Sequence, residues 1–80
     1  MSLTIKVLGV GCAKCAKAFE NVKDAVDTLG IDARISKVED MEEIINYGIL
    51  MTPGLVINDE VVQTGSIPTV KDIIRILSAY

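Results

Sequence analysis

The feature that most constrains the fold is a change in the spacing of apolar residues near the start of the chain. Over residues 3–8 every second residue is apolar, which is typical of a half-buried strand. Over residues 13–29 the spacing becomes helical, which is typical of an amphipathic helix. The predicted stripe of that helix is Ala16, Phe19, Val22, Val26 and Leu29. Two glycines, Gly9 and Gly11, mark a loop between the two elements, and Gly30 stands where a C-terminal cap is expected.

The rest of the chain predicts three more strands and two more helices. A strand is expected over residues 31–38, and a hairpin is expected from residues 55–57 and 61–62, because Asn58 and Asp59 tolerate a positive φ. A short helix over 41–47 follows Asp40, which forms a capping-box pattern with Glu43. A last helix follows Thr69, with Asp72 at its third position. Its apolar stripe is Val70, Ile73, Ile74 and Leu77.

The predicted order is therefore β-α-β-α-β-β-α, an α/β fold. A mixed four-stranded sheet with helices on both faces would cover all of these apolar stripes. The chain has 80 residues and no linker or repeat, so we expect a single domain over 1–80. No apolar stripe is left over beyond those assigned to the core, which favours a monomer.

Charge and composition exclude several functions. The formal net charge is −3 and no basic cluster is present, which argues against nucleic-acid binding. No histidine is present, so histidine-based catalysis and histidine-containing metal sites are excluded. No apolar run is long enough to span a membrane and no secretory leader is recognisable, so the expected location is the cytoplasm.

Two cysteines, Cys12 and Cys15, stand between the first strand and the first helix. A cysteine at a helix N-terminus faces unpaired N–H groups and the positive end of the helix dipole, so its thiol pKa should be lowered, and Lys14 adds a positive charge with the same effect. Cys12 is expected to attack a disulfide first and Cys15 to resolve the mixed disulfide. Half of a zinc site, two incidental buried cysteines, or cysteines that regulate a protein-interaction module remain as other interpretations.

A second motif is Met51-Thr52-Pro53, which lies just before the predicted hairpin. On physical grounds alone, Pro53 is a proline that starts a strand, since most X-Pro bonds are trans. Met51 directly precedes Thr52 and Pro53, so we expect it to line a groove for a substrate.

With this element order and these motifs, the chain resembles the thioredoxin-like small redox-active disulfide proteins of archaea and bacteria. The resemblance implies the thioredoxin fold without its extra N-terminal strand and helix. It implies that Cys12 and Cys15 are the redox pair, that Pro53 is cis and faces the disulfide, and that Gly65 is the glycine after the last strand. It also implies that the backbone of Thr52 pairs with an extended substrate.

The function implied by the resemblance is dithiol–disulfide oxidoreduction. The expected partners are disulfide-containing protein substrates and a flavoprotein similar to thioredoxin reductase. No metal or organic cofactor is expected, because the cysteine pair is itself the redox group. Thioredoxins have a buried aspartate six residues before the first cysteine, where this chain has Lys6. Lys6 is interpreted either as a solvated strand residue or as a residue that tunes the thiolate.

A carrier of soft metal ions is the alternative. The segment from Gly9 to Cys15 resembles the Gly-Met-x-Cys-x-x-Cys motif of heavy-metal-associated domains, and two thiolates suit Cu(I). Those domains have the order βαββαβ and end in a strand, whereas this chain is predicted to end in a helix. The last element therefore discriminates between the two functions.

Overall fold

The computed structural model describes residues 3–10 and 13–80. It contains the seven elements that the sequence predicts, in the predicted order. They are β1 (Leu3–Leu8), α1 (Ala13–Leu29), β2 (Ala33–Val38), α2 (Met41–Asn46), β3 (Gly54–Ile57), β4 (Glu60–Thr64) and α3 (Val70–Leu77). The predicted boundaries differ slightly at β2, which begins at Ala33, and at α2, where Tyr47 is the C-terminal cap.

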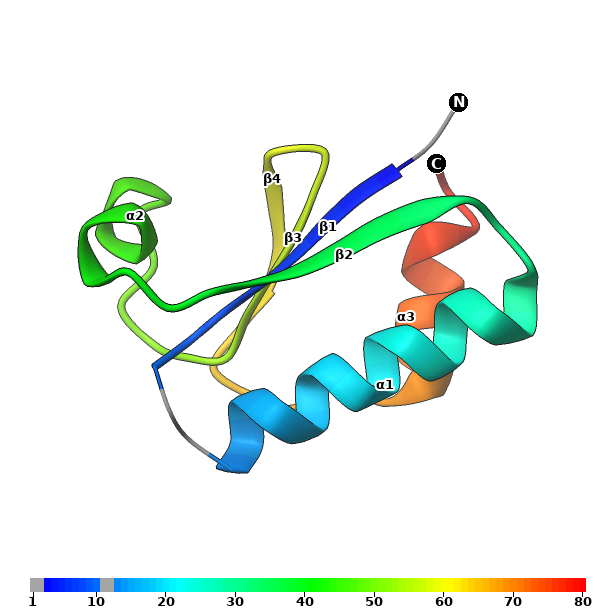
Figure 1. Ribbon diagram of the computed structural model, residues 1–80, viewed down its shortest axis with the longest axis horizontal. Helices are drawn as coiled ribbons and strands as arrows, with labels where there is room; N and C mark the ends of the chain where they lie inside the picture. Colours follow the sequence, from blue (N-terminus) through cyan, green and yellow to red (C-terminus); the bar gives the residue numbers. More distant parts are fainter. Residues whose placement is uncertain (1–2, 11–12) are drawn as a thin grey trace.

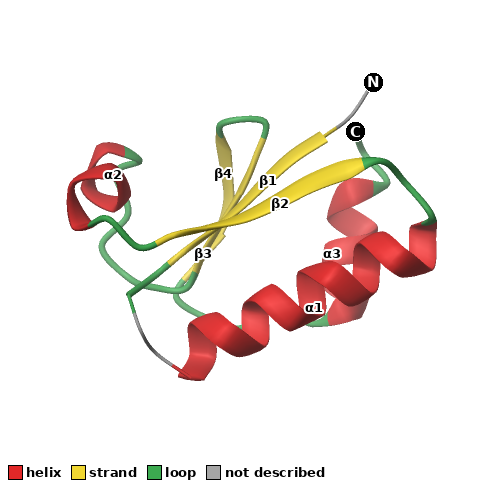
Figure 2. Ribbon diagram, in the orientation of Figure 1, coloured by secondary structure: helices red, strands yellow, loops and turns green. Residues whose placement is uncertain are grey.

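The four strands form one mixed sheet in the order β2-β1-β3-β4, which confirms the predicted fold class (Figure 2). β1 runs parallel to β2 and antiparallel to β3, while β3 and β4 form an antiparallel hairpin. All four residues of the central strand β3 are buried. At the hairpin turn Asn58 and Asp59 have φ values of 50° and 67°, as expected for the two residues of a tight β-turn.

Helices cover the two faces of the sheet unequally. α1 and α3 pack side by side on one face, and the short helix α2 lies at the other (Figure 1). Side chains of β1 point alternately to the two faces of the sheet, so this strand contributes to a core on each face. Ile5 and Val7 pack with residues of α1 and α3, whereas Leu8 packs with α2. The core under α2 is smaller and consists of Leu8, Val38, Ile44, Ile49 and Val56.

The buried stripe of α1 is rotated from the predicted one. Ala16, assigned to the stripe from its spacing, is exposed, and Phe19 and Leu29 lie at the edge of the core. The physical reason is that α1 packs against both the sheet and α3, so small side chains occupy the centre of the contact. The buried residues are Cys15, Ala18, Asn21, Val22, Ala25 and Val26.

The two later helices begin at the predicted caps. The Thr69 hydroxyl accepts a hydrogen bond from the Asp72 N–H at 3.1 Å. The Asp40 carboxylate accepts from the Glu42 N–H at 2.9 Å, one residue earlier than the Glu43 N–H that a capping box predicts. Asp40 therefore caps α2 through a local turn.

The expectation that the core accounts for every apolar stripe is also wrong. Large apolar side chains remain exposed outside the core, so the core does not account for all apolar surface. They are Val10, Met41, Ile45, Leu50, Met51, Ile67 and Tyr80. Among the described residues, no helix has the length and apolar character needed to cross a membrane.

Candidate functional site

Cys15 lies in the first turn of α1, against the end of β1. Its side chain is buried, with 8% of the residue exposed. A Cβ atom added to Gly9 would lie 2.1 Å from the Cys15 Sγ, so only glycine leaves room for the sulfur at this position. Gly9 is held in place by a hydrogen bond of 3.0 Å from its N–H to the Val38 carbonyl. Cys12 lies outside the described residues, and the sequence places it directly before Ala13, the first residue of α1.

The loop before β3 carries the second group of predicted residues. The Thr52–Pro53 peptide bond is cis, and the Pro53 carbonyl accepts a hydrogen bond of 3.0 Å from the Gly65 N–H. Gly65 has a φ of +86°, which favours glycine, and its open side is covered by the Met51 side chain. The Met51 Cβ lies 3.5 Å from the point where a Gly65 Cβ would stand. Met51, Pro53 and Gly65 therefore form one local unit.

Thr52 joins this unit to the cysteine. The Thr52 Cβ lies 3.6 Å from the point where a Gly9 Cβ would stand. The Cys15 Sγ lies 2.1 Å from that same point, so Thr52 and Cys15 are both next to Gly9. The structure thus brings Cys15, Thr52, Pro53 and the Met51–Gly65 contact to one end of the sheet. Lys14 is exposed in the first turn of α1, and its predicted effect on the thiolate stays a prediction.

Gly9 is a site residue that the sequence analysis treated only as part of a loop. Its role comes from close approach to a sulfur atom, which the spacing of apolar residues does not report. The signal that could have identified it is a glycine at the end of a strand, three residues before the first cysteine.

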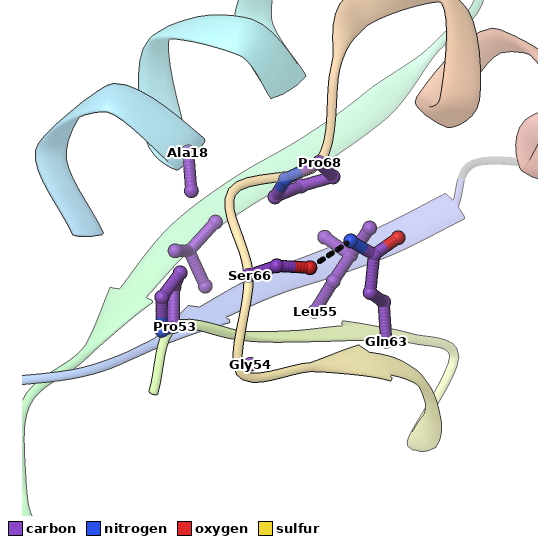
Figure 3. A pocket seen from close by; sticks show the side chains of 8 residues that line it. Ala18, Pro53, Gly54, Leu55, Gln63, Ser66 and Pro68 are labelled. Carbon is purple, nitrogen blue, oxygen red and sulfur yellow. Dashed lines mark hydrogen bonds between the residues drawn. The ribbon is translucent and has the colours of Figure 1, made fainter. Parts of the chain in front are cut away.

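A narrow crevice lies behind Pro53 (Figure 3). Its lining residues are Val7, Ala18, Pro53, Gly54, Leu55, Gln63, Ser66 and Pro68. It is too narrow to hold a water molecule, and Gln63 spans its outer side with a hydrogen bond of 3.2 Å to Ser66. The crevice is therefore a packing seam that supports the Pro53 loop.

A wider groove of about 300 Å³ lies next to α2. It is lined by Val10, Met41, Ile44, Ile45, Ile49, Leu50 and Thr52. Thr52 is the one predicted substrate-positioning residue in this lining, whereas Met51 is turned toward Gly65.

Lys6 lies on the α2 side of the sheet. Its ammonium donates a hydrogen bond of 3.0 Å to the Tyr47 hydroxyl and is 3.9 Å from the Asp59 carboxylate. The hydrogen bond to Tyr47, followed by the nearby charges, raises the pKa of Lys6. The structure therefore gives Lys6 a role in holding α2 to the hairpin, with 29% of its side chain exposed.

The metal-carrier alternative is not supported. The element order differs from the βαββαβ order of the heavy-metal-associated domains, because β2 is followed by α2 and not by another strand.

Comparison with known proteins is consistent with this geometry. Residues 3–78 match the family model described as a thioredoxin domain. A protein of Methanocaldococcus jannaschii named thioredoxin is 45% identical over 78 residues, which cover 98% of this chain and 90% of that protein. A protein of Methanothermobacter thermautotrophicus, also named thioredoxin, is 36% identical over 76 residues, which cover 95% of this chain and 99% of that protein. This chain, a thiol–disulfide oxidoreductase, therefore belongs to the thioredoxin family.

Proposed function

We propose that this oxidoreductase works through a reversible disulfide between Cys12 and Cys15 that reduces or exchanges disulfides in protein substrates. The observation that carries the proposal is the contact of buried Cys15 with Gly9, beside Thr52 and Pro53. It places a sulfur next to the loop that the family resemblance assigns to substrate binding. The cysteine pair is the redox group in this proposal, and no further cofactor takes part.

In the proposed reaction, the Cys12 thiolate attacks one sulfur of a substrate disulfide. A mixed disulfide forms, and the other substrate sulfur leaves as a thiolate that takes up a proton. The Cys15 thiol then loses its proton and attacks the Cys12 sulfur, which releases the second substrate thiol. The substrate gains two electrons and two protons, and the protein becomes the Cys12–Cys15 disulfide.

The surrounding residues have separate roles in the proposal. Lys14 stabilises the thiolate by its charge, because it is the cation nearest to Cys12 in the sequence. The backbone of Thr52 pairs with an extended substrate segment. Pro53, Gly65 and Met51 hold that backbone in place through the Pro53–Gly65 hydrogen bond and the Met51–Gly65 contact.

Thioredoxin relatives suggest disulfide substrates and a reductase as partners in general. We assign the reductase role to a flavoprotein of the thioredoxin-reductase kind, which returns two electrons to the Cys12–Cys15 disulfide. We also propose that the protein acts as a monomer in the cytoplasm, where other thiols are kept reduced.

The test is a redox titration of the chain in dithiothreitol buffers with a chelator present, read by thiol alkylation and mass. We expect a reversible two-electron transition between about −180 and −300 mV. Cys15→Ser should accumulate a mixed disulfide with substrate, whereas Cys12→Ser should form none. A chain that forms no internal disulfide, or forms one only after removal of bound metal, would contradict the proposal. Capture of the same partners by Cys12→Ser would instead indicate an interaction module.

A further inference from the structure

The groove beside α2 is an exposed apolar surface, and Thr52 is the one residue of its lining that has a role in the proposed function. We refer to it as the α2 groove, lined by the seven residues named above. Of these, Leu50 is 99% exposed, Ile45 61% and Met41 58%. Exposed side chains of this size, gathered around one concavity, are typical of an interaction site.

The α2 groove continues into the cysteine site. Val10, at one end of the groove, directly follows Gly9, which is in contact with Cys15. Thr52 lines the groove and also lies beside Gly9. A segment bound along the groove would therefore pass next to the Cys15 sulfur.

The charged residues of α2 and of the loop and hairpin that follow it are all acidic. Residues 38–70 contain no Lys or Arg. The acidic residues in this stretch are Glu39, Asp40, Glu42, Glu43, Asp59 and Glu60. The first four flank Met41 at the start of α2 and are exposed. Lys6, a cation of the same face, is engaged by Tyr47 and Asp59.

We propose that the α2 groove selects protein disulfides whose cysteine is followed or preceded by an aliphatic side chain and flanked by Lys or Arg. The aliphatic side chain would cover Ile45 and Leu50, and the basic residues would face the acidic start of α2. A second copy of this chain is a poor occupant, because it would bring its own acidic residues to the same place. This inference rests on the proposed function and names its substrate class.

The chemistry of the bound segment is the same exchange. Reduced protein and one peptide disulfide give oxidised protein and two peptide thiols, with two electrons and two protons passing to the peptides. The groove alters how often a disulfide meets the cysteine, and it alters no bond-making step.

The test uses symmetric disulfides of short peptides. One peptide has Leu beside its Cys and two Lys residues outside them, a second has Glu in place of Lys, and a third has Ser in place of Leu. Bis(2-hydroxyethyl) disulfide serves as a small uncharged substrate. The full reduced chain is mixed with each, quenched with acid, and the second-order rate constant is measured by chromatography at several salt concentrations.

We expect the Leu–Lys peptide to react about tenfold faster than the Leu–Glu peptide at low salt, and the ratio to approach one as salt screens the charges. The double variant Glu39→Lys, Glu42→Lys should remove this ratio. The double variant Glu20→Lys, Asp24→Lys makes the same charge change on the exposed side of α1 and should keep it. Ile45→Ser should slow the Leu–Lys peptide severalfold and leave the small disulfide unchanged.

The other outcomes separate the substrate selection from the proposed function. If the small disulfide is reduced but the three peptides react alike, the substrate selection is wrong and the proposed function stands. If the small disulfide is not reduced, the proposed function fails and the selection fails with it. If sedimentation shows a dimer that Ile45→Ser dissociates, the groove is occupied by a second copy and the proposal is overturned.

Discussion

The two faces of the sheet are built from the same kinds of aliphatic residue but are covered very differently. On one face α1 and α3, with 17 and 8 residues, cover a continuous core that includes Ile5, Val22 and Ile73, each 0% exposed. On the other face α2 has only 6 residues, and Ile44 is its one buried residue. The face under α1 and α3 therefore stabilises the fold, and the face under α2 leaves apolar side chains exposed for contacts with other molecules.

The difference follows from how much apolar surface a helix can bury. A helix of two or more turns offers a full stripe, so α1 and α3 bury side chains from several successive turns. A helix of less than two turns offers one inward position, so Met41 and Ile45 lie at the rim of its core. The cysteine site lies where the two faces meet, at the end of β1.

Truncation of one residue on each face should give the largest contrast. Ile73→Ala removes a fully buried side chain between α1 and the sheet, so we expect a loss of about 2–5 kcal/mol in the free energy of unfolding. Ile45→Ala, which is 61% exposed, should change it by about 0.5 kcal/mol or less. Urea unfolding of the reduced protein measures both. Equal losses would show that the α2 face is sealed in solution.

A buried hydrogen bond should give a smaller effect on the covered face. The Asn21 side-chain amide donates to the Pro68 carbonyl at 2.9 Å and ties α1 to the segment before α3. Asn21→Ala leaves that carbonyl buried without its donor, so we expect a loss of about 1–3 kcal/mol. Gln63→Ala, which breaks an exposed hydrogen bond to Ser66 nearby, is the control and should cost about 0.5 kcal/mol or less. A similar loss in both variants would mean that burial of the bond does not matter.

The smallest effect is expected on the α2 face, where high pH should lower the stability of the folded protein. The pKa of Lys6 is raised in the folded protein, chiefly by its hydrogen bond to Tyr47. Its contribution to stability is therefore complete below the unfolded-state pKa of 10.5 and is lost as the pH rises through the higher folded-state value. Urea midpoints between pH 9 and 12 should fall less steeply in Lys6→Met and Tyr47→Phe than in the parent. If the urea midpoints of both variants fall with pH as steeply as those of the parent, the Lys6–Tyr47 contact does not contribute to the pH dependence of stability.

The effect of Asp59→Asn sharpens the same measurement. Asp59 acts on Lys6 only through its charge, and its contribution is smaller than that of Tyr47. We therefore expect the urea midpoint of Asp59→Asn to fall with pH less steeply than that of the parent and more steeply than that of Tyr47→Phe.

Much of the fold could be predicted from local patterns. The alternation over β1, the helical spacing of α1 and the caps at Asp40 and Thr69 are encoded by residues close together in the sequence. The turn at Asn58 and Asp59 is also local, because both side chains tolerate a positive φ. These elements were predicted because each depends on the conformational preference of a few neighbouring residues.

The residues of the site were predicted only in part. Cys15 was identified from its place at a strand–helix junction, and the roles of Pro53 and Gly65 came from the family resemblance. The structure places all three at one end of the sheet. The contact between Gly9 and the Cys15 sulfur was not predicted, because a glycine in a loop has many structural uses. Ala16 was assigned to the wrong side of α1, since spacing alone does not report that α3 also packs against that helix.

The sequence by itself determined the elements, their order and the position of the cysteine pair at a strand–helix junction. Only the tertiary structure decided which apolar residues stay exposed, how Thr52 comes to lie beside Gly9, and that Lys6 is paired with Tyr47. The physical reason is that the first set depends on bond rotations and spacing within one segment. The second depends on how segments far apart in the chain pack together, and the six-residue helix α2 buries Ile44 against the sheet while Met41 and Ile45 stay exposed.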